Sequence, residues 1–228
     1  MPALSYKRAM AKRKLTFLIT AGPTVEDIDP VRFLSNRSTG RMGFALAKAA
    51  LQSGHRVILI SGPTDLVPPR RCHFVPVRSA RDMQQSVLRF FPQADITIKA
   101  AAVADYRPLK THSKKIKKKA ETLTLRLIKN PDILKILGKR KKKHQVLVGF
   151  AAETNDLVKN ALKKVRDKNL DWIAVNNVGR SDIGFATESN ELTFLSKDGS
   201  ILPFVKQSKD ALAKKMIRLL ITIRNQNQ

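Results

Sequence analysis

A loop that contains two glycines is the first segment whose residue types and spacing could do chemistry. Gly40 and Gly43 stand three residues apart, where an apolar run with helical spacing begins. A helix N-terminus offers free N–H donors and a partial positive charge, so this position favours an anion. Asn36 adds a neutral group that could hold a carboxylate or a mixed anhydride. The alternative is a polar loop in which Ser38 or Thr39 caps the helix, and these residues alone leave both interpretations open.

Three further loops carry residues suited to a nucleotide. Gly22, within the segment TAGPT, follows an apolar strand-like run and would let a phosphate approach the backbone, although a Gly-Pro pair is more often simply a turn. Asp105 follows Ala100 and Ala101, whose small side chains would let a flat ligand lie against the chain. The carboxylate could orient a ribose hydroxyl or hold a metal ion, or it could simply cap a turn. Phe150, in GFAAET, could stack on a base, although a position in the core is the simpler interpretation.

Lysines supply the remaining candidate contacts for a phosphate. A run of lysines spans 114–119, interrupted by one isoleucine, and a lysine on a mobile loop could reach a triphosphate. Lys164 and Lys168 stand four residues apart and would share one helix face. The default interpretation of both sets is a solvated surface. The histidines show no metal-ligand spacing, so the sequence leaves the metal ligands unknown.

Strand-like and helix-like runs alternate along most of the chain. Short apolar runs rich in Ile, Val and Leu predict strands that are buried on both faces. Amphipathic runs between them predict helices, one of which opens with a capping box at Ser79 and Asp82. The predicted strands are 15–20, 56–61, 73–77, 95–101, 146–151 and 171–176, and the predicted helices are 41–53, 79–91, 155–168 and 208–223.

The alternation predicts an α/β protein with three αβα layers, in which helices cover both faces of a mostly parallel sheet. A C-terminal hairpin that turns at 197–199 and a final helix would complete the fold. The side chains expected to point inward from that helix are Leu212, Met216, Leu219 and Ile223.

We expect the ligand at the edge where the strands end, because parallel sheets leave a crevice there. The candidate loops follow Thr20, Ala101 and Phe150, at the ends of predicted strands, and we expect them to meet at this edge. The segment 107–124 is too long and too charged for a tight connection, so we expect it to form a basic flap over the site.

Composition limits the class of protein. The chain has 228 residues with 43% hydrophobic side chains, which suits one large domain at 15–228 behind a basic tail at 1–14. Cys72 is the only cysteine, which suits a reducing cytoplasm, and no apolar run is long enough to span a membrane. The formal net charge of +26 favours phosphate-bearing partners, either nucleic acid or small phosphorylated ligands.

Taken in order along the chain, TAGPT, DPVRFLSN, STGRMG, AAVADYRP, KIKK, KNPDIL and GFAAET resemble the bacterial phosphopantothenate–cysteine ligase family. The similarity runs from about Leu15 to near Gly199. It implies a Rossmann-like fold, a homodimer, and the use of CTP with Mg2+ in coenzyme A synthesis. In that chemistry the carboxylate of 4′-phosphopantothenate attacks the α-phosphate of CTP, which yields an acyl-cytidylate and pyrophosphate. The amine of cysteine then displaces CMP and forms phosphopantothenoylcysteine.

The resemblance also implies roles for residues at matching positions. Asn36 would engage the acyl-cytidylate, and Lys115 on the flap would assist catalysis, while Asp29 and Arg32 match a dimer-contact segment. Residues expected to bind the acid substrate are Asn36, Ser38, Gly40 and Gly43. Residues expected to contact the nucleotide are Gly22, Lys99, Ala100, Ala101, Asp105, Lys115, Pro131, Asp132, Ile133, Leu134, Phe150, Lys164 and Lys168.

Some features depart from the family pattern. Lys99 stands where a small residue is more frequent, and the charge of +26 has no explanation in the enzymatic role. Many relatives carry an N-terminal flavin-dependent decarboxylase domain, so we expect a separate decarboxylase protein here. A nucleic-acid-binding module is the main rival, but the basic runs 114–119 and 139–144 contain no interleaved aromatic residues. A dinucleotide-binding protein would carry the G-x-G-x-x-G signature, which the glycine loop does not match.

Overall fold

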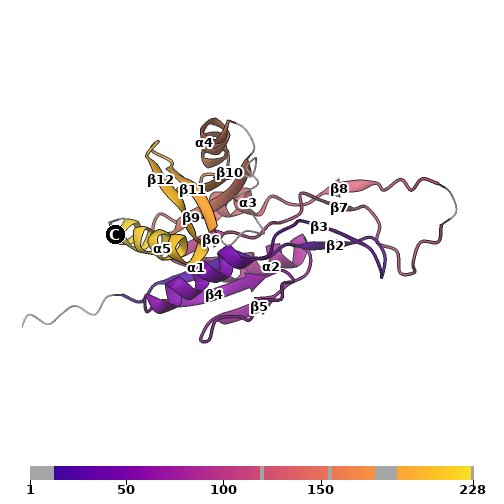
Figure 1. Cartoon of the computed structure of the whole chain (residues 1–228), viewed down its shortest axis with the longest axis horizontal. Helices are drawn as coiled ribbons and strands as arrows, with labels where there is room; N and C mark the ends of the chain where they lie inside the picture. Colours follow the sequence, from indigo (N-terminus) through magenta and orange to yellow (C-terminus); the bar gives the residue numbers. More distant parts are fainter. Residues whose placement is uncertain (1–12, 119–120, 154–155, 178–188, 227–228) are drawn as a thin grey trace, which may run out of the picture.

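Figure 1 shows the computed structural model, which describes residues 13–118, 121–153, 156–177 and 189–226. Most of the predicted basic tail lies outside these ranges. An eight-stranded sheet forms the centre, in the order β12-β11-β10-β9-β6-β1-β4-β5. Its parallel strands are β1 (Thr16–Ala21), β4 (Arg56–Ser61), β5 (His73–Pro76), β6 (Ile96–Lys99), β9 (Val146–Glu153) and β10 (Trp172–Asn177). The hairpin of β11 (Ser189–Ser196) and β12 (Ile201–Ser208) extends it antiparallel, as predicted.

The central strands are buried on both faces, as their continuous apolar sequence predicts. In β1, Phe17 and Ile19 pack into the core on one face of the sheet, and Leu18 packs into the core on the other face. None of the three side chains is exposed. A strand of this kind needs apolar helices against both of its faces.

Helices cover both faces of the sheet. α1 (Arg41–Gln52) and α5 (Lys209–Gln226) pack against each other on one face, as Figure 1 also shows. α2 (Ala80–Phe90), α3 (Ile133–Arg140) and α4 (Leu157–Asp167) contribute apolar side chains to the core on the opposite face. The predicted three-layer, Rossmann-like α/β fold is therefore confirmed.

The capping box predicted at the start of α2 is present. The hydroxyl of Ser79 accepts from the N–H of Asp82 at 3.1 Å, and the Asp82 carboxylate accepts from the N–H of Ser79 at 2.8 Å. The two bonds satisfy backbone donors that a helix start leaves open. A short 3-10 turn, Phe91–Gln93, ends this helix.

The last helix turns a different face to the core over its second half. Leu212 and Met216 are fully buried, as expected. Leu219 and Ile223 are only half-buried, and Leu220 takes a fully buried position instead. The expected positions follow a seven-residue repeat, from which a straight helix of about 3.6 residues per turn drifts, so the buried stripe shifts along the surface of the helix.

Two short ladders outside the main sheet are not predicted by the sequence. β2 (Val25–Asp27) pairs with β3 (Phe33–Ser35), and β7 (Tyr106–Pro108) pairs with β8 (Leu127–Lys129). Strands of three residues are too short to show a period of two. The predicted flap lies within an arm, described over residues 106–118 and 121–129, which runs beside β2 and β3 and extends away from the main sheet (Figure 1).

Gly43 sets how closely α1 packs against β1. A Cβ atom at this position would lie 2.5 Å from the Cβ atom of Ala21, at the end of β1. We therefore expect Gly43→Ala to push α1 from the sheet and to lower the free energy of unfolding by about 1–3 kcal/mol. Urea unfolding measures this change, and Gln52→Ala, at the exposed end of the same helix, is the control. Equal stability of the two variants would contradict the close packing.

Candidate functional site

The carboxyl ends of β1 and β6 form the switch point of the sheet. These strands are neighbours, but the chain continues from β1 toward β4 and from β6 toward β9, in opposite directions. The helix that follows β1, α1, lies on one face, and α3, which precedes β9, lies on the other. Open α/β sheets bind ligands in the crevice that such a divergence leaves.

Hydrogen bonds tie the two diverging loops together. The N–H of Ala102 donates to the carbonyl of Gly22 at 2.9 Å, and the N–H of Thr24 donates to the carbonyl of Ala102 at 3.2 Å. The N–H of Ala104 donates to the Thr24 hydroxyl at 2.9 Å. The same Ala102 carbonyl accepts from Nδ2 of Asn36 at 3.0 Å. The predicted catalytic amide is therefore held on the loop that follows β6.

The N-terminus of α1 opens beside Asn36. Gly40 takes the N-cap position with φ 77°, a left-handed conformation that glycine adopts without strain, and it has no side chain that could cap the helix. The Ser38 hydroxyl accepts instead from the N–H of Gly40, at 3.3 Å. This bond engages the N–H of the N-cap residue itself, so the capping and the anion-binding interpretations both stay predictions. Because the N-cap is a glycine, its position leaves room for an anion at the start of α1.

A cleft of about 880 Å³ lies at this point and brings most of the predicted residues together. Its lining comes from the loops after β1 and β6, from α1 and β9, from the segment that starts α3, and from α4 with its C-terminal end. The predicted site residues among its lining are Asn36, Ser38, Gly40, Gly43, Lys99, Ala100, Ala101, Asp105, Pro131, Asp132, Ile133, Leu134, Phe150, Lys164 and Lys168.

Two predicted residues do not line the cleft. A Cβ atom on Gly22 would lie 2.8 Å from the carbonyl oxygen of Gly62, and one on Gly40 would lie 3.2 Å from the nitrogen of Gly22. Gly22 is therefore packed between Gly62 and the N-cap of α1, where a larger residue would not fit. Lys115 is exposed on the arm, outside the residues that line the cleft.

Lysines give the cleft its electrostatic character. Burial, with a smaller contribution from the charge of Lys168, lowers the pKa of Lys99 to about 8. Lys168 forms an ion pair with Asp132 at 2.9 Å, and Lys164 forms one with Glu153. These pairs hold both lysines at the wall before any ligand arrives. Like-charged groups in a partly desolvated cleft favour the entry of an anion.

The two carboxylates of the predicted site differ in their surroundings. Asp132 accepts from the N–H of Lys135 as the N-cap of α3, and it also pairs with Lys168, so its oxygens are engaged. Asp105 is exposed in the cleft. Among the described residues no cluster of three or more His, Cys, Asp or Glu could hold a metal ion by itself. A carboxylate such as Asp105 can still bind Mg2+ jointly with ligand phosphates, which is how proteins commonly hold this ion.

Some lining residues have no role in the sequence-based prediction. Asn130 fixes the loop that carries Asp105, because its Nδ2 donates to the carbonyl of Ala104 and its N–H donates to the carbonyl of Asp105. Its place in KNPDIL is a signal that could have identified it. The others come from α1, the arm, and distant strands and helices, and they include Arg41, Tyr106, Lys129, Asn176, Asn190 and Lys209.

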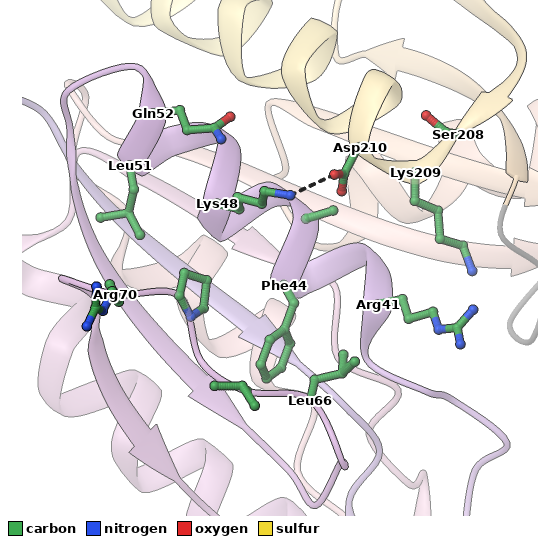
Figure 2. Close-up of a pocket in the computed structure, with 13 residues that line it drawn as sticks. Arg41, Phe44, Lys48, Leu51, Gln52, Leu66, Arg70, Ser208, Lys209 and Asp210 are labelled. Atoms are coloured by element: carbon green, nitrogen blue, oxygen red, sulfur yellow. Dashed lines mark hydrogen bonds and ion pairs between the residues drawn. The ribbon is translucent and has the colours of Figure 1, made fainter.

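A second hollow of about 810 Å³ lies on the outer side of α1 (Figure 2). Arg41 and Lys209 line both this hollow and the cleft. Figure 2 shows their charged groups close together, and burial, followed by the charge of Arg41, lowers the pKa of Lys209. Lys48 pairs with Asp210 at 2.9 Å beside them. The positive charge at the end of the cleft thus continues around the start of α1.

Comparison with known proteins places the chain in a family. The family model described as "DNA/pantothenate metabolism flavoprotein C-terminal domain" matches residues 12–223. The chain belongs to this family. The solved structure described as the C-terminal domain of coenzyme A biosynthesis bifunctional protein CoaBC has a TM-score of 0.80 and 40% identity, and the match covers 93% of this chain and 96% of that one.

Two similar proteins are longer than the chain. The coenzyme A biosynthesis bifunctional protein CoaBC of Bacillus subtilis is 53% identical over 183 residues, which cover 80% of this chain and 45% of that protein. A prokaryotic protein named cysteine/cysteine sulfinic acid decarboxylase is 45% identical over 206 residues, 90% of this chain and 57% of that protein. The chain thus spans about half the length of these relatives. Among the described helices, none has the length and apolar character that a membrane crossing requires.

The lowered pKa of Lys99 leads to a test of the cleft's electrostatics. A lysine whose folded pKa is about 8 destabilises the fold while it is charged, so Lys99→Met should stabilise the protein at pH 7. Each kcal/mol gained raises the unfolding midpoint by roughly 2–4 °C. Unfolded lysine keeps its proton to about pH 10.4, so the wild type gains stability between pH 8 and pH 10, and the advantage of the variant shrinks.

Calorimetry at pH 7 and at about pH 10 measures the unfolding midpoints of Lys99→Met and the wild type. Lys135→Met, at an exposed position of α3, is the matched control and should show no such change between the two pH values. An advantage of Lys99→Met that stays constant with pH would contradict the lowered pKa.

Proposed function

We propose that the chain is a phosphopantothenate–cysteine ligase of coenzyme A synthesis, which uses CTP and acts in the cytoplasm. The observation that carries this proposal is the convergence in one cleft of a helix N-terminus with a glycine N-cap, the amide of Asn36 and five lysines. Together these groups suit a triphosphate held beside a carboxylate. Membership of the family supports the same chemistry.

The first half-reaction activates the acid. A carboxylate oxygen of 4′-phosphopantothenate bonds to the α-phosphorus of CTP, and the bond from that phosphorus to the bridging oxygen of the β-phosphate breaks. Pyrophosphate leaves with the electron pair, so negative charge grows on the leaving group. The N–H groups at the start of α1, together with Lys164 and Lys168, neutralise this charge. Such a transfer depends on positioning and electrostatic stabilisation, without a protein nucleophile.

The nucleotide lies along the loop that follows β6. Ala100 and Ala101 leave room for a flat ligand, and Phe150 stacks on the base. The segment Pro131–Leu134 forms the opposite wall. Bound Mg2+ would add positive charge at the phosphates, and Asp105, which is exposed in the cleft, would hold it together with them.

The second half-reaction joins the acid to cysteine. The amine of cysteine bonds to the acyl carbon of the acyl-cytidylate, the bond from that carbon to the phosphate oxygen breaks, CMP leaves with the electron pair, and the nitrogen releases one proton to water. Asn36 holds the acyl group for this attack by hydrogen bonding. A neutral amide suits this role because it adds no charge that would repel the phosphate or trap the amine.

We also propose a homodimer that forms through the β2–β3 hairpin and the arm. Val31 and Phe33 on the hairpin, with Tyr106 and Leu109 on the arm, are apolar and each more than half exposed. Apolar side chains gathered on one extension of a protein mark an interaction surface. Lys115 is carried by the same extension. Light scattering that gives the mass of one chain in solution would contradict the dimer.

A reaction with purified components tests the proposed function. The protein is mixed with 4′-phosphopantothenate, cysteine and Mg2+, and supplied with either CTP or ATP. We expect CMP, pyrophosphate and phosphopantothenoylcysteine with CTP, and much less product with ATP. A separate reaction contains the protein and cysteine alone, because one relative is named a cysteine decarboxylase. Carbon dioxide from this reaction, with no CMP from the reaction that contains CTP, would overturn the ligase proposal.

Asn36→Asp tests the second half-reaction separately. A carboxylate at this position repels the phosphate of the acyl-cytidylate and cannot donate a hydrogen bond. We expect the acyl-cytidylate to accumulate while coupled product falls by about 10²-fold or more, the typical loss of one stabilising donor at a reacting group. Quenched reactions analysed by mass spectrometry follow both species. Asn225→Asp, an exposed change of the same charge on α5, is the control, and wild-type turnover by Asn36→Asp would remove Asn36 from the mechanism.

A further inference from the structure

One buried carboxylate joins the β2–β3 hairpin to the arm. The side chain of Asp29 is completely buried and accepts from the N–H groups of Val31 and Arg32, each at 2.9 Å. It also forms an ion pair with the guanidinium of Arg32. Its fourth partner is the N–H of Ile116, which lies 3.1 Å from Oδ2 and 87 residues further along the chain.

The same ion pair holds the other polar group of Ile116. Nη2 of Arg32 donates to the carbonyl oxygen of Ile116 at 3.2 Å. Both backbone groups of this residue are therefore held by Asp29 and Arg32, which we call the clamp. Hydrogen bonds with an ionised partner are about twice as strong as those between neutral groups.

Two more hydrogen bonds dock this part of the arm on the hairpin. The N–H of His112 donates to the carbonyl of Ile28 at 2.9 Å, and the hydroxyl of Thr111 donates to the carbonyl of Asp27 at 3.1 Å. The segment 111–116 is therefore fixed to the hairpin at three points. Figure 1 shows the hairpin and the arm running side by side away from the sheet.

Ile116 interrupts a run of exposed lysines, of which Lys114, Lys115, Lys117 and Lys118 are described. Neighbouring positive charges repel one another, so an unanchored chain of this composition spreads over many conformations. A residue held at both its N–H and its carbonyl restricts the torsions on either side. The clamp therefore determines the direction in which the adjacent lysines leave the backbone.

We propose that Asp29 and Arg32 are positioning residues, which hold the arm so that Lys115 keeps one fixed direction when the proposed dimer brings it to the triphosphate. The role of Lys115 rests on the proposed function, whereas the docking of the arm does not. Hydrogen bonding from Arg32, followed by smaller contributions from backbone N–H groups, holds the pKa of Asp29 well below its usual range. The clamp stays ionised at physiological pH and acts as a permanent anchor.

Trypsin tests the docking, because it cuts after the lysines of the arm. In Asp29→Asn one oxygen remains, but the amide turns N–H groups toward Ile116 and Arg32, so those donors lose their acceptor. We expect cleavage within 114–118, located by mass spectrometry, to become about ten-fold faster, as for the loss of roughly one charged hydrogen bond. Arg32→Gln is the second variant, because it removes the contact to the Ile116 carbonyl and keeps the buried carboxylate.

The hairpin offers a matched control for this measurement. Among the described residues the carboxylate of Asp27 hydrogen-bonds to Arg78 alone, so Asp27→Asn also breaks an ion pair of the hairpin but spares the clamp. Its arm should be cut at the wild-type rate. Equal cleavage rates for Asp27→Asn and both clamp variants would overturn the proposal.

Kinetics test the connection to Lys115. Asp29→Asn should raise the KM for CTP or lower kcat by about ten-fold, and it should add less than about two-fold to Lys115→Gln, because both changes remove one contact. Fully additive effects would overturn the positioning role. An inactive wild type would overturn the proposed function and with it the role of Lys115, while the trypsin rates would still confirm or refute the docking.

Discussion

The site depends on the hydrogen bonds that tie the loop after β1 to the loop after β6. These loops belong to neighbouring strands whose chains leave in opposite directions, so without cross-links the crevice between them would have no fixed width. Ala102 supplies the central cross-link, because its N–H and carbonyl bond to Gly22 and Thr24. Asn36 bonds to the same carbonyl. The amide proposed for catalysis is thus positioned by backbone groups, which are more rigid than surface side chains.

Charge in the cleft is arranged before a ligand binds. Lys164 and Lys168 are paired with carboxylates, which keep them in place at modest cost, whereas Lys99 is partly desolvated and its pKa falls. An anion that enters this environment gains from all three lysines. Among the described residues, five lysines and two arginines line the cleft, against 44 basic residues in the chain, so the cleft alone does not account for the overall charge of +26.

Much of the fold could be predicted because its signals are local. The apolar run of β1 is one short stretch of sequence, and the two residues of the α2 capping box are three positions apart. Both features appear as expected. α3 is missing from the sequence-based prediction although Asp132, its N-cap, precedes an apolar run. Asn190 and Lys209 reach the cleft only because of the strand order and the packing of α5, which no spacing within one sequence reveals.

The segment between β1 and α1 connects the two parts of the proposed site. Its middle carries Asp29, which holds the arm, and its end carries Asn36, which lies in the cleft. The β2–β3 hairpin, which contains Asp29, is fixed to the start of α2, because the buried carboxylate of Glu26 accepts from the N–H of Ala80 at 2.8 Å. The Ser35 hydroxyl also donates to a backbone carbonyl in the loop after β1. Any movement of this hairpin would shift the arm lysines and the catalytic amide together, so the rigidity of one short ladder sets the geometry of both.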